Sequence, residues 1–201
     1  GFSPNDRTYL QGVSVLEPAS VYTFDANLNK IGHKRYWDWS YQPQEASSSS
    51  FHDELHHVLH SSLSCSTKEK RVSLPLSGGL DSRTLAGVLT ENHDKLYQSL
   101  WSYSYGFGDS SVETKIASKI AKACKVDFTG YLTPDYLFQS IDEITDSVEL
   151  FQYVTGTRQA AIVDNLSADA DVVIGGHWGD VWMDIMGVEG EDTAAWFKKK
   201  I

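Results

Sequence analysis

From residue 51 onward, apolar positions alternate between the spacing of helices and the short runs of buried strands. The helical spacing predicts helices over 51–63, 82–91, 112–124, 134–151 and 157–168. Short apolar runs predict strands over 71–76, 97–105, 125–131 and 171–175. Strands separated by helical stretches of this length are typical of βαβ units. The sequence therefore predicts an α/β fold, with a parallel twisted sheet and helices on both faces.

The first 45 residues follow a different pattern, rich in Tyr, Trp, Asn and Pro. Two β-like stretches, 21–24 and 31–37, flank the polar segment 25–30, which is typical of a hairpin turn. The polar stretch 42–50 then predicts a linker. Ser50 and Asp53 offer an N-cap and an early acidic residue for the helix that follows. We therefore expect a short β-hairpin segment over 1–45 and a separate domain over 46–201.

Composition and charge exclude several classes of protein. Of the 201 residues, 41% are hydrophobic and 22% are charged, a balance that allows a sizeable core and argues against disorder. The net charge of −10 argues against a nucleic-acid partner, because phosphate contacts need clustered basic side chains. No apolar run is long enough to span a bilayer, so we expect no membrane partner. Cys65 and Cys124 lack metal-site spacing, and we expect buried structural thiols in a cytoplasmic protein.

The segment 76–82, with the sequence LSGGLDS, lies between a predicted strand and a predicted helix. The first turn of a helix offers free N–H groups and a positive dipole end, both of which attract anions. The two glycines remove side-chain bulk, so that the backbone can close around a phosphate, and the serines add hydroxyl donors. The aspartate fits an anion site when Mg²⁺ bridges its carboxylate to the phosphates.

This segment resembles the pyrophosphate loop of the N-type ATP pyrophosphatases, and most of all that of the synthetase domain of the asparagine synthetases. The resemblance implies an adenine-nucleotide alpha-hydrolase-like fold and ATP bound across the strand ends. The residues that it assigns to ATP and pyrophosphate are Leu76, Ser77, Gly78, Gly79, Leu80, Asp81 and Ser82. A further match over 101–107 puts Tyr105 beside the adenine, with Leu76 on the other side. Arg83 departs from the commoner small residue, and either a phosphate contact or an ion pair with a surface acid fits it.

The segment 171–180, with the sequence DVVIGGHWGD, is similar to a second loop of the same family. Gly175 and Gly176 fall in register with the family's glycines and join the ATP-binding residues. Asp180 falls in register with a metal-binding acid, so the resemblance implies Mg²⁺ between Asp81 and Asp180. His177 stands where the family has an acidic residue. It is the candidate catalytic group, which either donates to phosphate or substrate or stays a solvated loop side chain.

Residues 16–38 resemble the closing hairpin of a class II glutaminase domain and its exit to the synthetase domain. Such glutaminases use an N-terminal cysteine as nucleophile, whereas residue 1 here is glycine, so we expect no glutamine hydrolysis from this chain. We interpret 1–45 as a remnant of a glutaminase-type domain with its linker. The family's synthetase domain extends further and carries a catalytic lysine there, so we interpret 46–201 as an ATP-pyrophosphatase domain truncated at its C-terminus.

The resemblance implies an ATP-dependent carbon–nitrogen ligase of asparagine synthetase type, with ATP and Mg²⁺ as cofactors. A small carboxylate, aspartate by default, is activated as an acyl-adenylate with release of pyrophosphate. Ammonia then comes from glutamine through a glutaminase domain or subunit. A homodimer is the oligomeric state that we would test.

Three alternatives stay open. The first is a related amide-forming synthetase that makes a β-lactam, cyclises a peptide or amidates a sugar acid. The second is a non-catalytic nucleotide-binding domain. The third is a pyrophosphatase that modifies sulfur or a nucleotide, which would need a reactive cysteine or a basic surface, and the sequence shows neither.

Overall fold

The computed structural model describes residues 6–8, 10–38, 40, 47–91, 96–108, 111–148 and 154–177. The chain divides into two units, one made of 1–48 with 135–161 and the other of 49–134 with 162–201. Within the described ranges, no helix combines the length and the apolar character that crossing a bilayer requires.

Strands β1 (Ser20–Phe24) and β2 (Lys30–Arg35) form an antiparallel hairpin, as the sequence predicts. Asp25 holds the turn, because its Oδ1 accepts the N–H groups of Asn27 and Asn29 at 2.9 and 2.8 Å. The side-chain amide of Asn29 also donates to Oδ2 of Asp25 at 3.0 Å, and this bond is the main cause that lowers the pKa of Asp25. An aspartate that satisfies the turn amides in this way is typical of an Asx turn, and it favours one register of the two strands.

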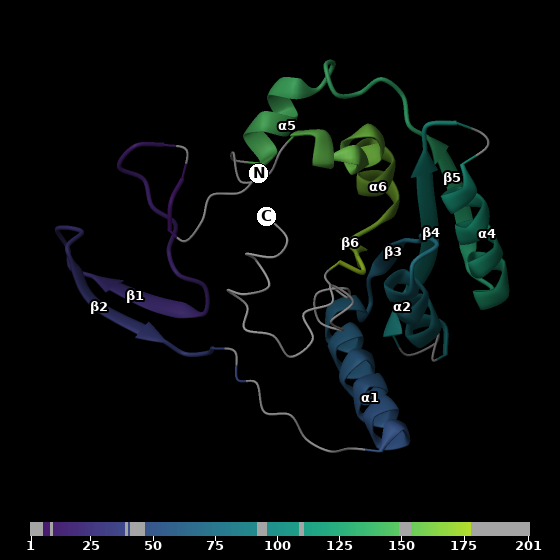
Figure 1. The fold of residues 1–201 in the computed structure, drawn as a ribbon, viewed down its shortest axis with the longest axis horizontal. Helices are drawn as coiled ribbons and strands as arrows, with labels where there is room; N and C mark the ends of the chain where they lie inside the picture. Colours follow the sequence, from purple (N-terminus) through teal and green to yellow (C-terminus); the bar gives the residue numbers. More distant parts are fainter. Residues whose placement is uncertain are drawn as a thin grey trace, which may run out of the picture. The chain divides into compact units, whose positions relative to one another are not determined.

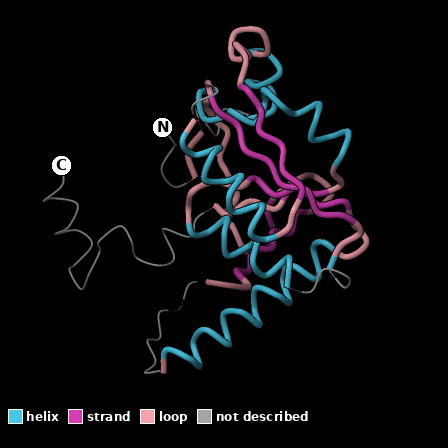
Figure 2. Tube along the Cα trace, turned by 90° about the vertical axis from the view of Figure 1, so that its right-hand side faces the viewer, coloured by secondary structure: helices cyan, strands magenta, loops and turns pink. Residues whose placement is uncertain are grey.

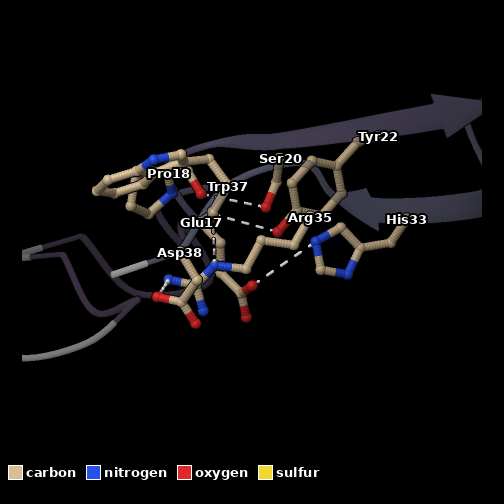
Figure 3. A network of polar contacts seen from close by, with 8 residues as sticks. All are labelled: Glu17, Pro18, Ser20, Tyr22, His33, Arg35, Trp37 and Asp38. Carbon is tan, nitrogen blue, oxygen red and sulfur yellow. Dashed lines mark hydrogen bonds and ion pairs between the residues drawn. The ribbon is translucent and has the colours of Figure 1, made fainter. Parts of the chain in front are cut away.

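A polar network ties the open end of this hairpin to the chain on either side of it (Figure 3). His33 Nε2 lies 3.6 Å from a carboxylate oxygen of Glu17, and its ring stacks on Tyr22 with centroids 4.3 Å apart. Arg35 pairs with Asp38 at 3.0 Å. Solvent reaches these groups, so the network fixes local geometry and adds little stability.

The second unit is built on a parallel sheet, shown in Figures 1 and 2. Its strands are β3 (Arg71–Pro75), β4 (Ser99–Gly106), β5 (Asp127–Leu132) and β6 (Val172–Val173), in the order β5-β4-β3-β6. The chain moves outward from β3 to β5 and then returns to the other side of β3. Because crossovers are right-handed, the return connection lies on the opposite face of the sheet. Ligand sites in such sheets form where the connections diverge, here at the carboxyl end of β3.

Helices cover both faces of this sheet, which confirms the predicted α/β class. Helices α1 (Ser48–Thr67), α2 (Leu80–Glu91) and α4 (Val112–Cys124) contribute to the main core. Helix α4 lies along β4 and β5, as Figure 1 shows, and it contacts α2, whereas α6 (Val163–Asp169) contacts β3. The buried core residues are Leu63, Val72, Leu74, Leu76, Ala86, Val88, Leu89, Leu96, Tyr97, Ala117 and Ala121.

Three alternate residues of β4, Trp101, Tyr103 and Tyr105, place aromatic rings on the face of the sheet opposite the main core. Trp101 stacks on Tyr103 with centroids 5.3 Å apart, and Tyr103 stacks on Tyr105 at 6.5 Å. Tyr131 of β5 meets Tyr103 edge to face. Burial raises the pKa of the Tyr103 phenol, and its hydroxyl has no hydrogen-bond partner within the described part of the chain.

Some predicted bounds and burials are wrong. Helix α1 begins at Ser48, so the last serines of the predicted linker are helical and Ser50 does not cap the helix. Residues 134–140 are not helical, and α5 spans Ile141–Val148, since a proline at 134 followed by an aspartate favours a turn. The segment that precedes α6 forms the 3₁₀ turns Val154–Gly156 and Arg158–Ile162. Cys65 is exposed on α1 rather than buried, whereas Cys124 is half-buried.

Candidate functional site

Two serine hydroxyls organise the loop that links β3 to α2. Ser82 Oγ lies 3.0 Å from Ser77 Oγ and accepts the Ser77 N–H at 3.1 Å. In turn, Ser77 Oγ accepts the N–H of Gly79 at 3.1 Å. Ser82 is only 5% exposed. Because a buried hydroxyl needs partners, this pair holds the loop in one shape before any ligand arrives.

Neither backbone conformation nor packing requires glycine at position 78. Its φ lies outside the left-handed region, and a Cβ there would lie 3.6 Å from its nearest neighbour, Ile116. At Gly79 a Cβ would lie 3.2 Å from Ser77 Oγ and would disturb the hydroxyl pair. Gly79 and Leu80 are exposed, and the first-turn amides of α2 have no intrahelical acceptor. The loop therefore presents bare backbone and N–H groups at the carboxyl end of β3, an arrangement that suits an anion.

Arg83 makes a contact that the sequence does not predict. Its guanidinium donates to the carbonyl of Gly78 at 2.5 Å, from an exposed position on α2. Among the described residues it forms no ion pair with an acid. The contact fixes the orientation of the peptide bond that follows Gly78.

Strand β6 brings the second predicted loop to the same place. Asp171 accepts the backbone N–H of Arg71 at 2.8 Å and its guanidinium at 2.9 Å. The side-chain bond from Arg71 is the main cause that lowers the pKa of Asp171, and the same bond raises the pKa of Arg71. The N–H of Ile174 donates to the carbonyl of Ser73 at 3.0 Å, so the chain leaves β6 alongside β3.

Gly176 then passes against the start of α2. A Cβ at Gly176 would lie 3.0 Å from the Ser82 nitrogen and 3.1 Å from both Cβ and the carbonyl carbon of Asp81. The structure thus brings together two segments that lie almost a hundred residues apart in the chain. Glycine is favoured at this point because a side chain would crowd the start of α2.

Gly175 and His177, which flank Gly176, are both exposed. The His177 ring folds back over Gly175, and a Cβ at Gly175 would lie 2.7 Å from that ring. Within the described residues, His177 has no hydrogen bond or ion pair, so its proposed role stays a prediction. Asp180 lies outside the described residues, and the pairing of Asp180 with Asp81 also stays a prediction.

Asp81 offers one half-buried carboxylate beside the loop. Among the described residues, no group of three or more His, Cys, Asp or Glu side chains is arranged to hold a metal. Mg²⁺ commonly binds through one or two carboxylates together with substrate phosphates. The single described carboxylate of Asp81 therefore fits Mg²⁺ that arrives with a nucleotide.

Leu76 and Tyr105 lie at the carboxyl ends of neighbouring strands. The register pairs Pro75 with Tyr103, and the N–H of Leu76 donates to the Tyr103 carbonyl at 2.7 Å. Leu76 is 2% exposed and belongs to the main core. Tyr105 is half-buried. The placement of adenine between Leu76 and Tyr105 stays a prediction.

The fold and this loop define an α/β domain with a turn of glycine and serine residues after a central strand. Residues 54–189 match the family model described as "Asparagine synthase". Because that match covers more than half of the chain, the protein belongs to the asparagine synthase family. No match to a curated protein was found.

Two solved structures are similar to the chain. The first, an NH₃-dependent NAD synthetase from Campylobacter jejuni, is 14% identical, with a TM-score of 0.43 over 68% of this chain and 60% of that chain. The second, the U34-tRNA thiolase NcsA from Methanococcus maripaludis, is 22% identical, with a TM-score of 0.49 over 72% of this chain and 52% of that chain. The chain thus spans between half and two thirds of the length of these two proteins.

Proposed function

We propose that this protein is an ATP-dependent, amide-forming ligase of the asparagine synthetase type. The observation that carries the proposal is the loop 76–82, a serine-organised turn with bare glycine backbone at the carboxyl end of β3. The β- and γ-phosphates of ATP would bind this loop. The adenine would lie between the backbones of Leu76 and Tyr105. Membership in the asparagine synthase family supports the same placement.

Mg²⁺ would be held by Asp81, with Asp180 as the second carboxylate. When bound, it neutralises phosphate charge and so eases the departure of pyrophosphate. The chain's own part is to position the nucleotide and to donate hydrogen bonds to its phosphates, through the first-turn amides of α2 and the hydroxyls of Ser77 and Ser82. Phosphate would compete with the hydrogen bonds that these serines now make with each other.

In the proposed reaction a carboxylate oxygen of the substrate attacks the α-phosphorus of ATP. The bond from this phosphorus to the bridging oxygen breaks, pyrophosphate leaves and an acyl-adenylate forms. Ammonia then attacks the acyl carbon, loses a proton, and AMP leaves with the oxygen of the former carboxylate. Aspartate is the proposed carboxylate. His177 is the proposed proton-handling group or phosphate donor at the edge of this site.

The remaining assignments belong to the same proposal. Residues 1–45 would be the end of a glutaminase-type domain, and a complete glutaminase domain or subunit would supply ammonia from glutamine. A homodimer is the proposed oligomeric state. We propose a cytoplasmic location, because Cys65 and Cys124 are free thiols of the kind that reducing compartments keep.

Exchange of labelled pyrophosphate into ATP tests the proposal, because reversible adenylation of an acceptor produces it and its dependence on a carboxylate identifies the acceptor. We expect exchange that depends on both Mg²⁺ and aspartate. Asp81→Ala should abolish it. Asp142→Ala is the matched control, since Asp142 holds the equivalent second position of α5 and is exposed, and it should leave exchange unchanged.

Two results would contradict the proposal. Exchange that survives Asp81→Ala would remove the metal-binding role of that carboxylate. ATP that binds without any exchange, for every carboxylate supplied, would make this a nucleotide-binding domain and not a ligase.

A further inference from the structure

A groove of about 560 Å³ runs between α4 and the edge strand β5. Its walls come from Gly108 and Ser111 before α4, from the first turns of that helix and from the second half of β5. The strand β4 separates β5 from β3, so the groove is distinct from the loop 76–82. The residues that line it are Gly108, Ser111, Thr114, Lys115, Ser118, Lys119, Phe128, Gly130, Tyr131 and Leu132.

The helical wall of this groove is basic and rich in hydroxyls. Lys115 and Lys119 are four residues apart, so their side chains neighbour each other on one face of α4. Both are exposed, and neither forms an ion pair with any described residue. The hydroxyl of Ser111 caps the helix by accepting the N–H of Thr114 at 3.4 Å, and the Thr114 hydroxyl donates to it at 3.2 Å. In a chain of net charge −10, two adjacent uncompensated ammonium groups form a local positive site.

The strand wall of the groove is apolar. Phe128 packs against the main core, Tyr131 is half-buried and Leu132 is 61% exposed. Gly130 lets the two walls approach, because a Cβ there would lie 3.1 Å from Cγ2 of Thr114. The volume falls within the range of about 300–1,000 Å³ that is typical of small-molecule sites.

We propose that this groove binds a phosphate group, with Lys115 and Lys119 as its cationic ligands. A phosphate dianion can take one ammonium on each side, and lysine binds phosphate as a point charge. The exposed apolar wall beside the lysines suits the organic part of a phosphate ester. The ligand class is therefore a small phosphorylated compound, and free phosphate shares the chemistry of its head group.

Titration of the whole chain, followed by NMR of its backbone amides, tests this proposal. The probes are inorganic phosphate and phenyl phosphate. We expect saturable shifts at Ser111, Thr114 and Ser118. Each of the variants Lys115→Ala and Lys119→Ala should weaken binding by roughly two- to fivefold, the range of one exposed charge contact.

Lys122→Ala is the matched control, because Lys122 is an exposed lysine of the same helix that does not line the groove. It should leave the affinity unchanged. Leu132→Ala distinguishes the two sources of phosphate. If the ligand is an ester, this variant should bind phenyl phosphate more weakly and inorganic phosphate with unchanged affinity. Equal affinities of the wild type for both probes would identify free phosphate as the ligand of the same site.

Three results would overturn the proposal. One is the absence of saturable shifts with either probe. Another is shifts confined to residues 77–82, which would place phosphate on the loop after β3 instead. The last is an equal loss of affinity in Lys122→Ala and in the two groove variants, which would indicate non-specific attraction to the basic face of α4.

Discussion

Replacing Gly176 by alanine tests whether the loop after β6 rests on the start of α2. The added Cβ would lie 3.0–3.1 Å from the Ser82 nitrogen and from two atoms of Asp81. Such distances are tighter than nine in ten Cβ contacts in real proteins. Two of the atoms are backbone and the third is a Cβ, so no side-chain rotation can relieve the contact. The loop or the helix start must move by a few tenths of an ångström.

Overpacking of this kind destabilises proteins by about 1–3 kcal/mol. In a chain of this length, each kcal/mol lowers the melting temperature by roughly 2–4 °C. Thermal and urea unfolding measure the effect. Gly87→Ala is the control, because a Cβ at this exposed position of α2 meets nothing within 4 Å. It should stabilise the helix by about 0.5–1 kcal/mol.

The reasoning also predicts a loss of ATP affinity in Gly176→Ala, since the same shift moves Asp81 and the first turn of α2. A variant that unfolds at or above the temperature of the wild type would refute the close approach of the two loops. A variant that is destabilised but binds ATP normally would separate this contact from the nucleotide site.

Three other changes give clear expectations. Asp171→Asn removes the ion pair with Arg71. Because folding lowers the pKa of Asp171, the ion pair stabilises the protein fully above the ordinary aspartate pKa of about 4, and this stabilisation is lost as the pH falls through the lower folded pKa. The stability of the variant should therefore fall less steeply than that of the wild type below pH about 4. Tyr103→Phe deletes a buried hydroxyl that has no partner among the described residues, and urea unfolding should show unchanged stability or a gain of up to about 1 kcal/mol. Ser82→Ala leaves the N–H of Ser77 without its acceptor and should cost about 1–3 kcal/mol, whereas Ser82→Thr keeps a hydroxyl and should cost less.

Each of these expectations has a contrary result. For Asp171 the control is Asp164→Asn, which removes the same charge from α6. If both variants lose stability equally as the pH falls below about 4, the ion pair of Asp171 does not cause the difference from the wild type. A loss of more than about 1 kcal/mol in Tyr103→Phe would mean that its hydroxyl bonds to a group outside the described residues. Equal stability of Ser82→Ala and the wild type would show that the hydroxyl pair does not hold the loop.

Elements with local signals could be predicted from the sequence. Helix α4 has its predicted bounds, because Ser111 caps its start and Lys125 ends it in the left-handed conformation with a φ of 57°. The hairpin follows from the turn chemistry of Asp25. The parallel sheet follows from the alternation of strands and helices, which depends on hydrophobic spacing and not on any one contact.

Features that depend on tertiary contacts could not be predicted. A proline such as Pro75 is disfavoured in a central strand, because it has no N–H to donate. The sequence does not reveal that β6 pairs with β3 only at Val72 and Ser73, so that Pro75 interrupts no hydrogen bond with β6. The start of α1 within a serine run has no local signal. Cys65 is exposed because of the side of α1 on which it falls, and cysteine by itself does not specify that side.

Only part of the candidate site could be predicted from the sequence. Its loop, and the strand ends that carry it, follow from the LSGGLDS segment and its place between a strand and a helix. The hydroxyl pair of Ser77 and Ser82 depends on side-chain rotamers, as does the bond from Arg83 to Gly78. The contact of Gly176 with α2 depends on how β6 joins the sheet. None of these leaves a periodic signal in the sequence.

Calorimetric titration of the whole chain with ATP, with and without Mg²⁺, tests the central claim most directly. The account predicts saturable binding that needs Mg²⁺ and that Asp81→Asn abolishes, while Asp142→Asn retains it. Binding that is equally tight without Mg²⁺, or that Asp81→Asn leaves unchanged, would contradict the assignment of the loop 76–82 to the phosphates of ATP.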